Sequence, residues 1–109
     1  MSTNALTNSP APAGFTAVTP YLMVPGGTAA RFLSFLEAAF GAESAMKVPR
    51  PDGSIMHAEI RVAGCVLECA DANEQFPARP AALHFYVPDV EAAYRAALAA
   101  GAESLYEPA

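Results

Sequence analysis

The stretch from Val24-Pro25 to Gly41-Ala42-Glu43-Ser44 decides the fold predicted for this chain, because both of its ends recur later in the sequence. The second copy runs from Val87-Pro88 to Gly101-Ala102-Glu103-Ser104. In each copy a short apolar segment meets a proline, an apolar stretch with helical spacing follows, and a glycine precedes a further segment. Self-similarity of this kind indicates one supersecondary unit used twice. Two such units can build a cavity between them, so the repeat bears on function as well as on fold.

The first copy predicts a strand, a helix and three more strands. Residues 19–24 form the first strand, and Thr28 is a suitable N-cap for a helix whose apolar residues recur at helical spacing. Gly41 supplies the left-handed residue that ends this helix. The three further strands are predicted at residues 45–48, 54–62 and 65–70. Ala63-Gly64 joins the last two of them as a two-residue hairpin turn.

The second copy predicts the same order of elements but contains fewer of them. A strand is expected at 82–87, a helix follows from its N-cap Asp89 to Gly101, and a further strand starts at Leu105-Tyr106. We therefore expect an α+β fold of paired βαβββ modules, with the second module incomplete in this chain. The predicted limits are a flexible N-terminal arm at 1–18 and a single domain at 19–109, with modules at 19–72 and 81–109.

Composition excludes several classes of function. The chain has 109 residues, of which 53% are hydrophobic and 16% charged, and this balance favours one globular domain. Its net charge of −5 disfavours nucleic acids and anionic membranes as partners. No apolar run approaches the roughly 20 residues that a membrane-spanning helix needs. Cys65 and Cys69 would lie too far apart on one strand to form a disulfide, which suits a reducing cytoplasm. We therefore expect a cytoplasmic protein with no nucleic-acid or membrane partner.

Alternate positions of the predicted strands define a polar face on the side of the sheet away from the helices. Both histidines of the chain fall on this face. We expect the face to be either a wet surface or the wall of a cavity. Its candidate ligand-binding residues are Tyr21, His57, Arg61 and Tyr86.

The predicted hairpin places Glu59 directly opposite Glu68 on the polar face, about 5 Å apart. Two carboxylates at this distance repel, so solvent, the diagonal Arg61, protonation of one carboxylate or a bound cation must offset the repulsion. Arg61 and water give the simpler explanation, because charged residues are mostly exposed. The alternative is a cavity wall that holds a ligand or a metal, with Glu68 and His84 as a partial metal site, because His and Glu are ordinary metal ligands.

Four segments of the chain resemble the vicinal oxygen chelate superfamily, which contains glyoxalases, bleomycin-resistance proteins and extradiol dioxygenases. The PhnB-like proteins are the most similar branch. The resemblance covers about residues 19–108. The segments that carry it are 20–24 (PYLMV), 38–42 (AAFGA), 51–60 (PDGSIMHAEI) and 83–90 (LHFYVPDV).

The resemblance implies two βαβββ modules that curl around a shared cleft, with metal ligands on the first and fourth strands of each module. Glu68 matches the fourth-strand position of the first module, and His84 lies close to the first-strand position of the second, where the family's histidine more often falls at Ala82. Tyr21 and Thr19 offer only hydroxyls at the corresponding places. We therefore expect a divalent metal to bind weakly or not at all, with Glu68 and His84 contributing rather than His57.

The resemblance also implies two alternative functions. One is a lyase, isomerase, transferase or dioxygenase in which a divalent metal polarises a small substrate and a carboxylate, Glu68 or Glu59, moves a proton. The other is a metal-free protein that binds and sequesters a drug or metabolite, or a truncated non-catalytic relative. In each case the partners are a small-molecule ligand and, because paired modules often assemble further, a second copy in a homodimer.

Overall fold

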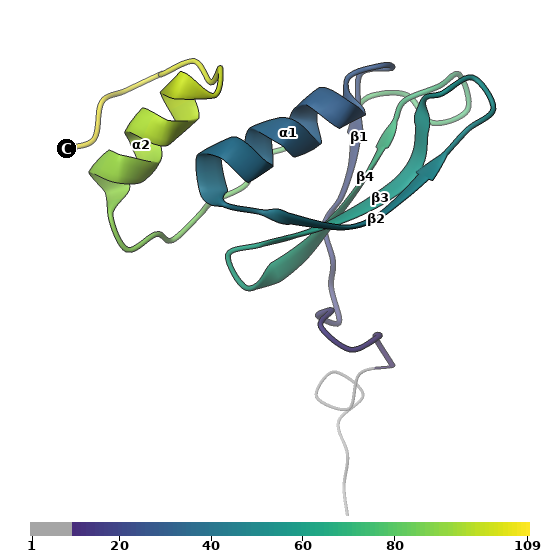
Figure 1. The fold of residues 1–109 in the computed structure, drawn as a ribbon, viewed down its shortest axis with the longest axis horizontal. Coiled ribbons are helices and arrows are strands. Elements are labelled where there is room, and N and C mark those ends of the chain that lie inside the picture. The colour runs from purple at the N-terminus through teal and green to yellow at the C-terminus, as the bar shows by residue number, and fades with distance from the viewer. Residues whose placement is uncertain (1–9) are drawn as a thin grey trace, which may run out of the picture.

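The computed structural model describes residues 10–109 and contains one mixed sheet and two helices (Figure 1). The sheet has four strands in the order β1-β4-β3-β2. Strand β1 runs parallel to β4, and the other neighbouring pairs are antiparallel. The bounds of the elements are β1 Tyr21–Val24, α1 Ala29–Phe40, β2 Glu43–Pro49, β3 Ile55–Val62, β4 Cys65–Asp71 and α2 Val90–Ala99. The fold is thus α+β, and β1 to β4 with α1 form one complete βαβββ unit.

The core lies between α1 and one face of the sheet. Leu33 and Leu36 of α1 are at most 2% exposed and belong to the same buried cluster as Ile60 of β3 and Cys69 of β4. Burying an aliphatic side chain of this size stabilises the fold by roughly 1.5–3 kcal/mol. Helix α1 carries the chain from β1 at one edge of the sheet to β2 at the other edge, which is the crossover that parallel strands need, and it covers the apolar face on the way. The opposite face of the sheet, called the open face below, is covered by neither helix of residues 10–109 (Figure 1).

A buried carboxylate at the end of β4 fixes the start of α1. Asp71 is 2% exposed, and its two oxygens accept hydrogen bonds from the backbone N–H groups of Ala29 at 2.9 Å and Ile55 at 2.7 Å. Burial alone would raise the pKa of Asp71, but the N–H groups of Ile55, Ala29, Gly27 and Thr28 outweigh it and lower that pKa. Thr28 is the N-cap residue as predicted, yet its hydroxyl donates to the Pro25 carbonyl and makes no cap hydrogen bond.

The predicted hairpin between β3 and β4 is confirmed, with Val62 paired to Cys65 and Glu59 to Glu68. Glycine 41 has a φ of 66° and ends α1 as predicted. An irregularity that the sequence pattern did not predict occurs at the start of β3. Val48 pairs with His57 but Pro49 pairs with Ile55, so Met56 is an extra residue on β3. This bulge allows Ile55 to face the core while His57 faces the other side.

Of the elements predicted for the second copy of the repeat, the helix forms and the strands do not. Helix α2 forms, and Asp89 caps it by accepting a hydrogen bond from the Ala92 N–H at 3.1 Å, as predicted. The strands predicted at 82–87 and 105–106 do not form. Just before the first of these segments the Arg79 N–H donates to the Met23 carbonyl of β1 at 3.1 Å, but the segment itself makes no strand ladder. Its Phe85 ring stacks on Phe40 of α1 with 4.3 Å between the ring centres.

Helix α2 lies alongside α1 and has no buried residue (Figure 1). The paired arrangement of two complete modules is therefore not part of this structure, because the second copy has a helix but no sheet to cover. Within residues 10–109, neither helix has the length and hydrophobicity that a membrane crossing requires. The predicted arm at 1–18 remains a prediction, and residues 1–9 lie outside the described part of the chain.

Candidate functional site

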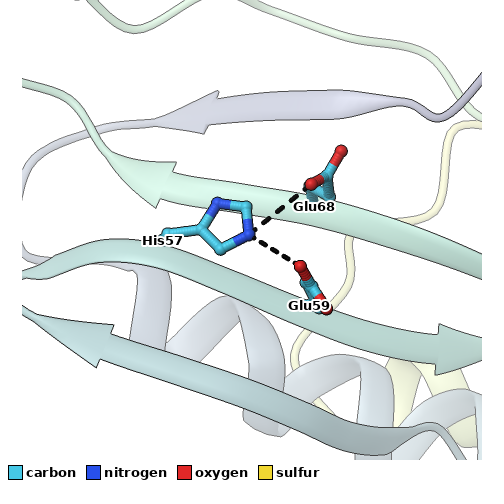
Figure 2. Close-up of side chains that lie close together, drawn as sticks. All are labelled: His57, Glu59 and Glu68. Carbon is cyan, nitrogen blue, oxygen red and sulfur yellow. Dashed lines mark hydrogen bonds and ion pairs between the residues drawn. The ribbon is translucent and has the colours of Figure 1, made fainter. Parts of the chain in front are cut away.

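Three side chains meet on the open face of the sheet and form a cluster that we call the histidine–carboxylate cluster: His57, Glu59 and Glu68 (Figure 2). The His57 Nε2 atom lies 2.9 Å from Glu59 Oε2 and 3.5 Å from Glu68 Oε1. All three side chains are partly buried, with 17–24% of each exposed. One ligand atom from each residue lies within 4.8 Å of the others.

Strand register brings the cluster together. Glu68 pairs with Glu59 across the β3–β4 ladder and with Tyr21 across the β1–β4 ladder, so these three residues form one row across the sheet. His57 precedes Glu59 by two positions on β3, and side chains two apart on a strand point to the same face. The imidazole therefore reaches along β3 to the Glu59–Glu68 pair (Figure 2).

Tyr21 holds the other side of the imidazole. Its hydroxyl oxygen lies 3.2 Å from His57 Nδ1. When Nε2 carries the proton and donates to Glu59, Nδ1 accepts from the Tyr21 hydroxyl. Burial and then the nearby Glu68 carboxylate raise the pKa of Tyr21, so this residue is a neutral phenol at physiological pH. Tyr21 is thus a positioning residue for His57.

The side chain that contacts the Glu59–Glu68 pair is not the predicted one. Arg61 together with water was the simpler of the two predicted explanations for how the two negative charges are offset, but Arg61 is exposed and forms no ion pair among the described residues. The His57 Nε2 atom faces both carboxylates instead. The signal was present in the sequence, because the spacing His57-x-Glu59 on a strand places both residues on one face.

The other predicted site residues lie elsewhere. His84 is in the irregular segment after β4, where its ring stacks on Tyr86 with 4.6 Å between the ring centres. It borders a cavity with Pro20 and Cys65, not the cluster. The structure thus brings Tyr21, His57, Glu59 and Glu68 together and does not bring His84, Tyr86 or Arg61 to them. The cause for His84 is that the strand predicted at 82–87 does not form.

The donor set of the cluster suits a divalent metal. One imidazole nitrogen and two carboxylate oxygens are ligands that zinc, nickel, manganese and iron accept. Two ligands bonded tetrahedrally to zinc at about 2.0–2.1 Å lie about 3.3 Å apart. The 2.9 Å and 3.5 Å separations from His57 Nε2 to the two carboxylates bracket that value. The three residues could therefore hold a cation and leave further coordination positions for water or a ligand.

The cysteines take no part in the site. Cys69 is buried in the core, and its burial followed by the nearby Asp71 charge raises the pKa of its thiol to about 11. Cys65 is half-buried, and both thiols are free. Because the thiolate is the nucleophilic form, Cys69 is unreactive at physiological pH.

No protein-family model matches the chain. Its sequence relatives include the uncharacterised protein Mb0911c of Mycobacterium bovis, which is 32% identical over 97 residues, with 79% of this chain and 62% of that protein covered. The uncharacterised protein Rv0887c of Mycobacterium tuberculosis has the same identity over 97 residues, with 79% of this chain and 56% of that protein covered. The chain therefore spans little more than half the length of the curated relatives that it matches.

Two solved structures share the fold. The gene product At5g48480 of Arabidopsis thaliana superimposes with a TM-score of 0.64 at 21% identity, covering 86% of this chain and 80% of that one. A PhnB protein of Bacillus cereus, provisionally assigned as a 3-demethylubiquinone-9 3-methyltransferase, superimposes with a TM-score of 0.59 at 21% identity. That match covers 76% of this chain and 70% of the other. The chain thus has a PhnB-like fold.

Proposed function

We propose that this chain is a small-molecule-binding protein of the vicinal oxygen chelate superfamily, which binds its ligand on the open face of the sheet with the help of a weakly held divalent cation. The observation that carries the proposal is the histidine–carboxylate cluster, in which three ligand atoms lie within 4.8 Å of one another. The PhnB-like fold and the resemblance of residues 19–108 to the superfamily support it.

The chain's own residues have separate roles in this proposal. Glu59 and Glu68 supply negative charge, and His57 supplies the lone pair of Nε2 in the tautomer whose proton is on Nδ1. The Nδ1–H group then donates to the Tyr21 hydroxyl, which orients the ring as outer partners of metal-bound histidines usually do. A cation held here would act as a Lewis acid toward oxygens of the ligand. Because the cation has to displace the His57–Glu59 hydrogen bond, we expect weak binding.

Metal analysis and titration test this proposal. After dialysis the protein should contain less than one metal ion per chain, and calorimetric titration should then detect weak zinc or nickel binding. Glu68→Gln, Glu59→Gln and His57→Gln should each lower the affinity by about tenfold or more, because each removes a direct ligand. His84→Gln is the matched control and should leave the affinity unchanged, since His84 stacks on Tyr86 away from the cluster. Affinity that depends on His84 and not on His57 would contradict the assignment.

The position of His57 favours metal-free ligand binding as the second candidate function. The His57 Nε2 atom already lies 2.9 Å and 3.5 Å from the two carboxylates and gives them a hydrogen-bonding partner without a cation. Under this alternative, zinc and nickel titrations show no binding above that of the Glu68→Gln variant, while small molecules still bind to the open face.

A further inference from the structure

A cleft of about 600 Å³ lies on the open face next to the histidine–carboxylate cluster. Tyr21 belongs to both, because its side chain borders the cleft and its hydroxyl contacts His57. The walls are mainly apolar and come from Met23, Met56, Ala70 and Phe76. Pockets of roughly 300–1,000 Å³ with apolar walls and a few polar groups are typical of small-molecule sites.

Arg50 is the one charged residue among the described residues that line this cleft. Its Nη1 atom donates to the neutral Ser54 hydroxyl at 3.2 Å, and none of the ion pairs among residues 10–109 involves it. The nearby Asp52 carboxylate accepts from the Ser54 N–H and hydroxyl at Oδ1, at 2.9 Å and 2.6 Å, and makes no ion pair with Arg50. A guanidinium has five N–H donors in a planar fork, so Arg50 retains donors for an anionic group.

Local hydrogen bonds fix the two ends of the cleft before any ligand binds. The Arg50 N–H donates to the Ser54 carbonyl at 2.7 Å, and the Gly53 N–H donates to the Arg50 carbonyl at 2.9 Å. On the opposite side, the Phe76 N–H donates to the Asn73 side-chain oxygen at 2.7 Å, and the Asn73 N–H donates to the Phe76 carbonyl at 2.9 Å. Residues held in this way lose little conformational entropy on binding.

We infer that this cleft binds a small organic anion, whose carboxylate, sulfonate or phosphate pairs with Arg50 and whose apolar body lies against Met23, Met56 and Phe76. The inference rests on the proposed function and adds the class of ligand. The charge belongs at Arg50, because the Glu59 and Glu68 carboxylates, which lie next to the cleft beyond Tyr21 and His57, repel an anionic group. The chain's net charge of −5 also means that a general positive field does not attract the anion.

A pair of fluorescent probes tests the inference. Anilinonaphthalene sulfonate has an aromatic body and one sulfonate, and phenylnaphthylamine is the same body without the charge. The wild-type protein should bind the sulfonate about tenfold or more tightly than the neutral probe, the ratio expected for one charge-assisted hydrogen-bonded pair. Arg50→Gln should remove this preference, Arg50→Lys should retain much of it, and Phe76→Ala should weaken both probes.

Arg31 provides the matched control, because it lines a different cavity with Phe32, Phe35 and Gly101 beside α1. Arg31→Gln should leave both probes unaffected. In the wild-type protein, which needs no variant to fold, the sulfonate probe should shift the amide resonances of residues 70–76 and leave those of 100–102 unchanged. Circular dichroism melts of each variant confirm that the fold is retained.

The outcomes separate this inference from the proposed function. Equal affinity for the two probes, with shifts at residues 70–76, overturns the anion preference and leaves small-molecule binding on the open face intact. A preference that is lost in Arg31→Gln, or shifts confined to 100–102, overturns the assignment to this cleft. Absence of binding by both probes overturns the inference and counts against the proposed small-molecule function as well, whereas the metal titrations address the cluster alone.

Discussion

The two copies of Gly-Ala-Glu-Ser have the same sequence but different structures. Both glycines have a positive φ, 66° for Gly41 and 113° for Gly101, and both follow a helix. After Gly41 the chain enters strand β2, where Glu43 pairs with Arg61 and Ser44 pairs with Ile60. After Gly101 it continues as bends and irregular structure to residue 109. The repeated sequence therefore determines the positive φ of its glycine by itself, but it does not determine whether a strand follows.

The difference shows that a strand depends on a partner outside its own sequence. The first Gly-Ala-Glu-Ser copy pairs with β3, and Ala42 is buried in the core cluster. The second copy has no strand beside it within residues 10–109, and its Ala102 is only half-buried. An unpaired strand leaves its backbone N–H and C=O groups to water, so isolated strand sequences are marginal at best. Helix α2 forms without a core because its hydrogen bonds lie within the segment itself.

The largest expected difference in stability is between substitutions of two aspartates, Asp71, which binds the start of α1, and Asp89, which caps α2. Replacing Asp71 by Ala removes the acceptor for two buried N–H groups, those of Ala29 and Ile55, and should destabilise the protein by about 4 kcal/mol. Asp89→Ala removes one exposed cap from α2 and should cost about 1 kcal/mol or less. Urea denaturation at neutral pH measures both. Similar losses for the two variants would contradict the view that the first module carries the stability.

The Asp71 contribution should also depend on pH. Because the folded-state pKa of Asp71 is lowered, its contribution is fully present above the unfolded value of about 3.9 and is lost as pH falls through the folded pKa. The stability difference between wild type and Asp71→Ala should therefore be constant near neutrality and shrink below about pH 4. A difference that stays constant down to pH 3 would show that the charge of Asp71 is not what stabilises the start of α1.

Most of the first module could be predicted from the sequence because its signals are local. Helical spacing ending at Gly41, the turn at Ala63-Gly64 and the alternation of β3 and β4 were enough to place Glu59 opposite Glu68. The capping role of Asp71 could not be predicted in this way. Asp71 is 42 positions from Ala29 in the sequence, and only the folded sheet brings the end of β4 to the start of α1.

The candidate site was predicted in part for the same reason. Residues on β1, β3 and β4 met because strand pairing follows from the hydrophobic pattern. His84 was assigned to the polar face through a strand at 82–87, and that assignment failed because the segment has no ladder to hold its alternation. The bulge at Met56 also escaped prediction.

Substitutions of one leucine on each helix should differ in their effect on stability by an intermediate amount. Leu36 on α1 is 2% exposed, whereas Leu98 on α2 is 40% exposed. Leu36→Ala should cost about 3 kcal/mol, since it removes buried methyl groups and leaves a cavity, and Leu98→Ala should cost less than about 1 kcal/mol. Chemical denaturation of the two single variants measures the difference. A cost for Leu98→Ala that approaches the cost for Leu36→Ala would mean that α2 is buried in solution, for instance against a second copy.

The smallest expected difference in stability is between substitutions of the alanine in each copy of the repeat. Ala42 and Ala102 occupy the same place in the two Gly-Ala-Glu-Ser copies, but Ala42 lies in the core cluster and Ala102 does not. Ala42→Ser places a hydroxyl among apolar side chains and should cost about 1–2 kcal/mol, because burying a hydroxyl without a partner is unfavourable. Ala102→Ser should change the stability by less than about 0.5 kcal/mol, as surface substitutions usually do.

Thermal melts of both variants under identical conditions give the comparison, and for a domain of this size 1 kcal/mol corresponds to roughly 4–8 °C. Equal shifts in the two variants would mean that the two copies have the same environment in solution, as they would if the second module acquired a sheet.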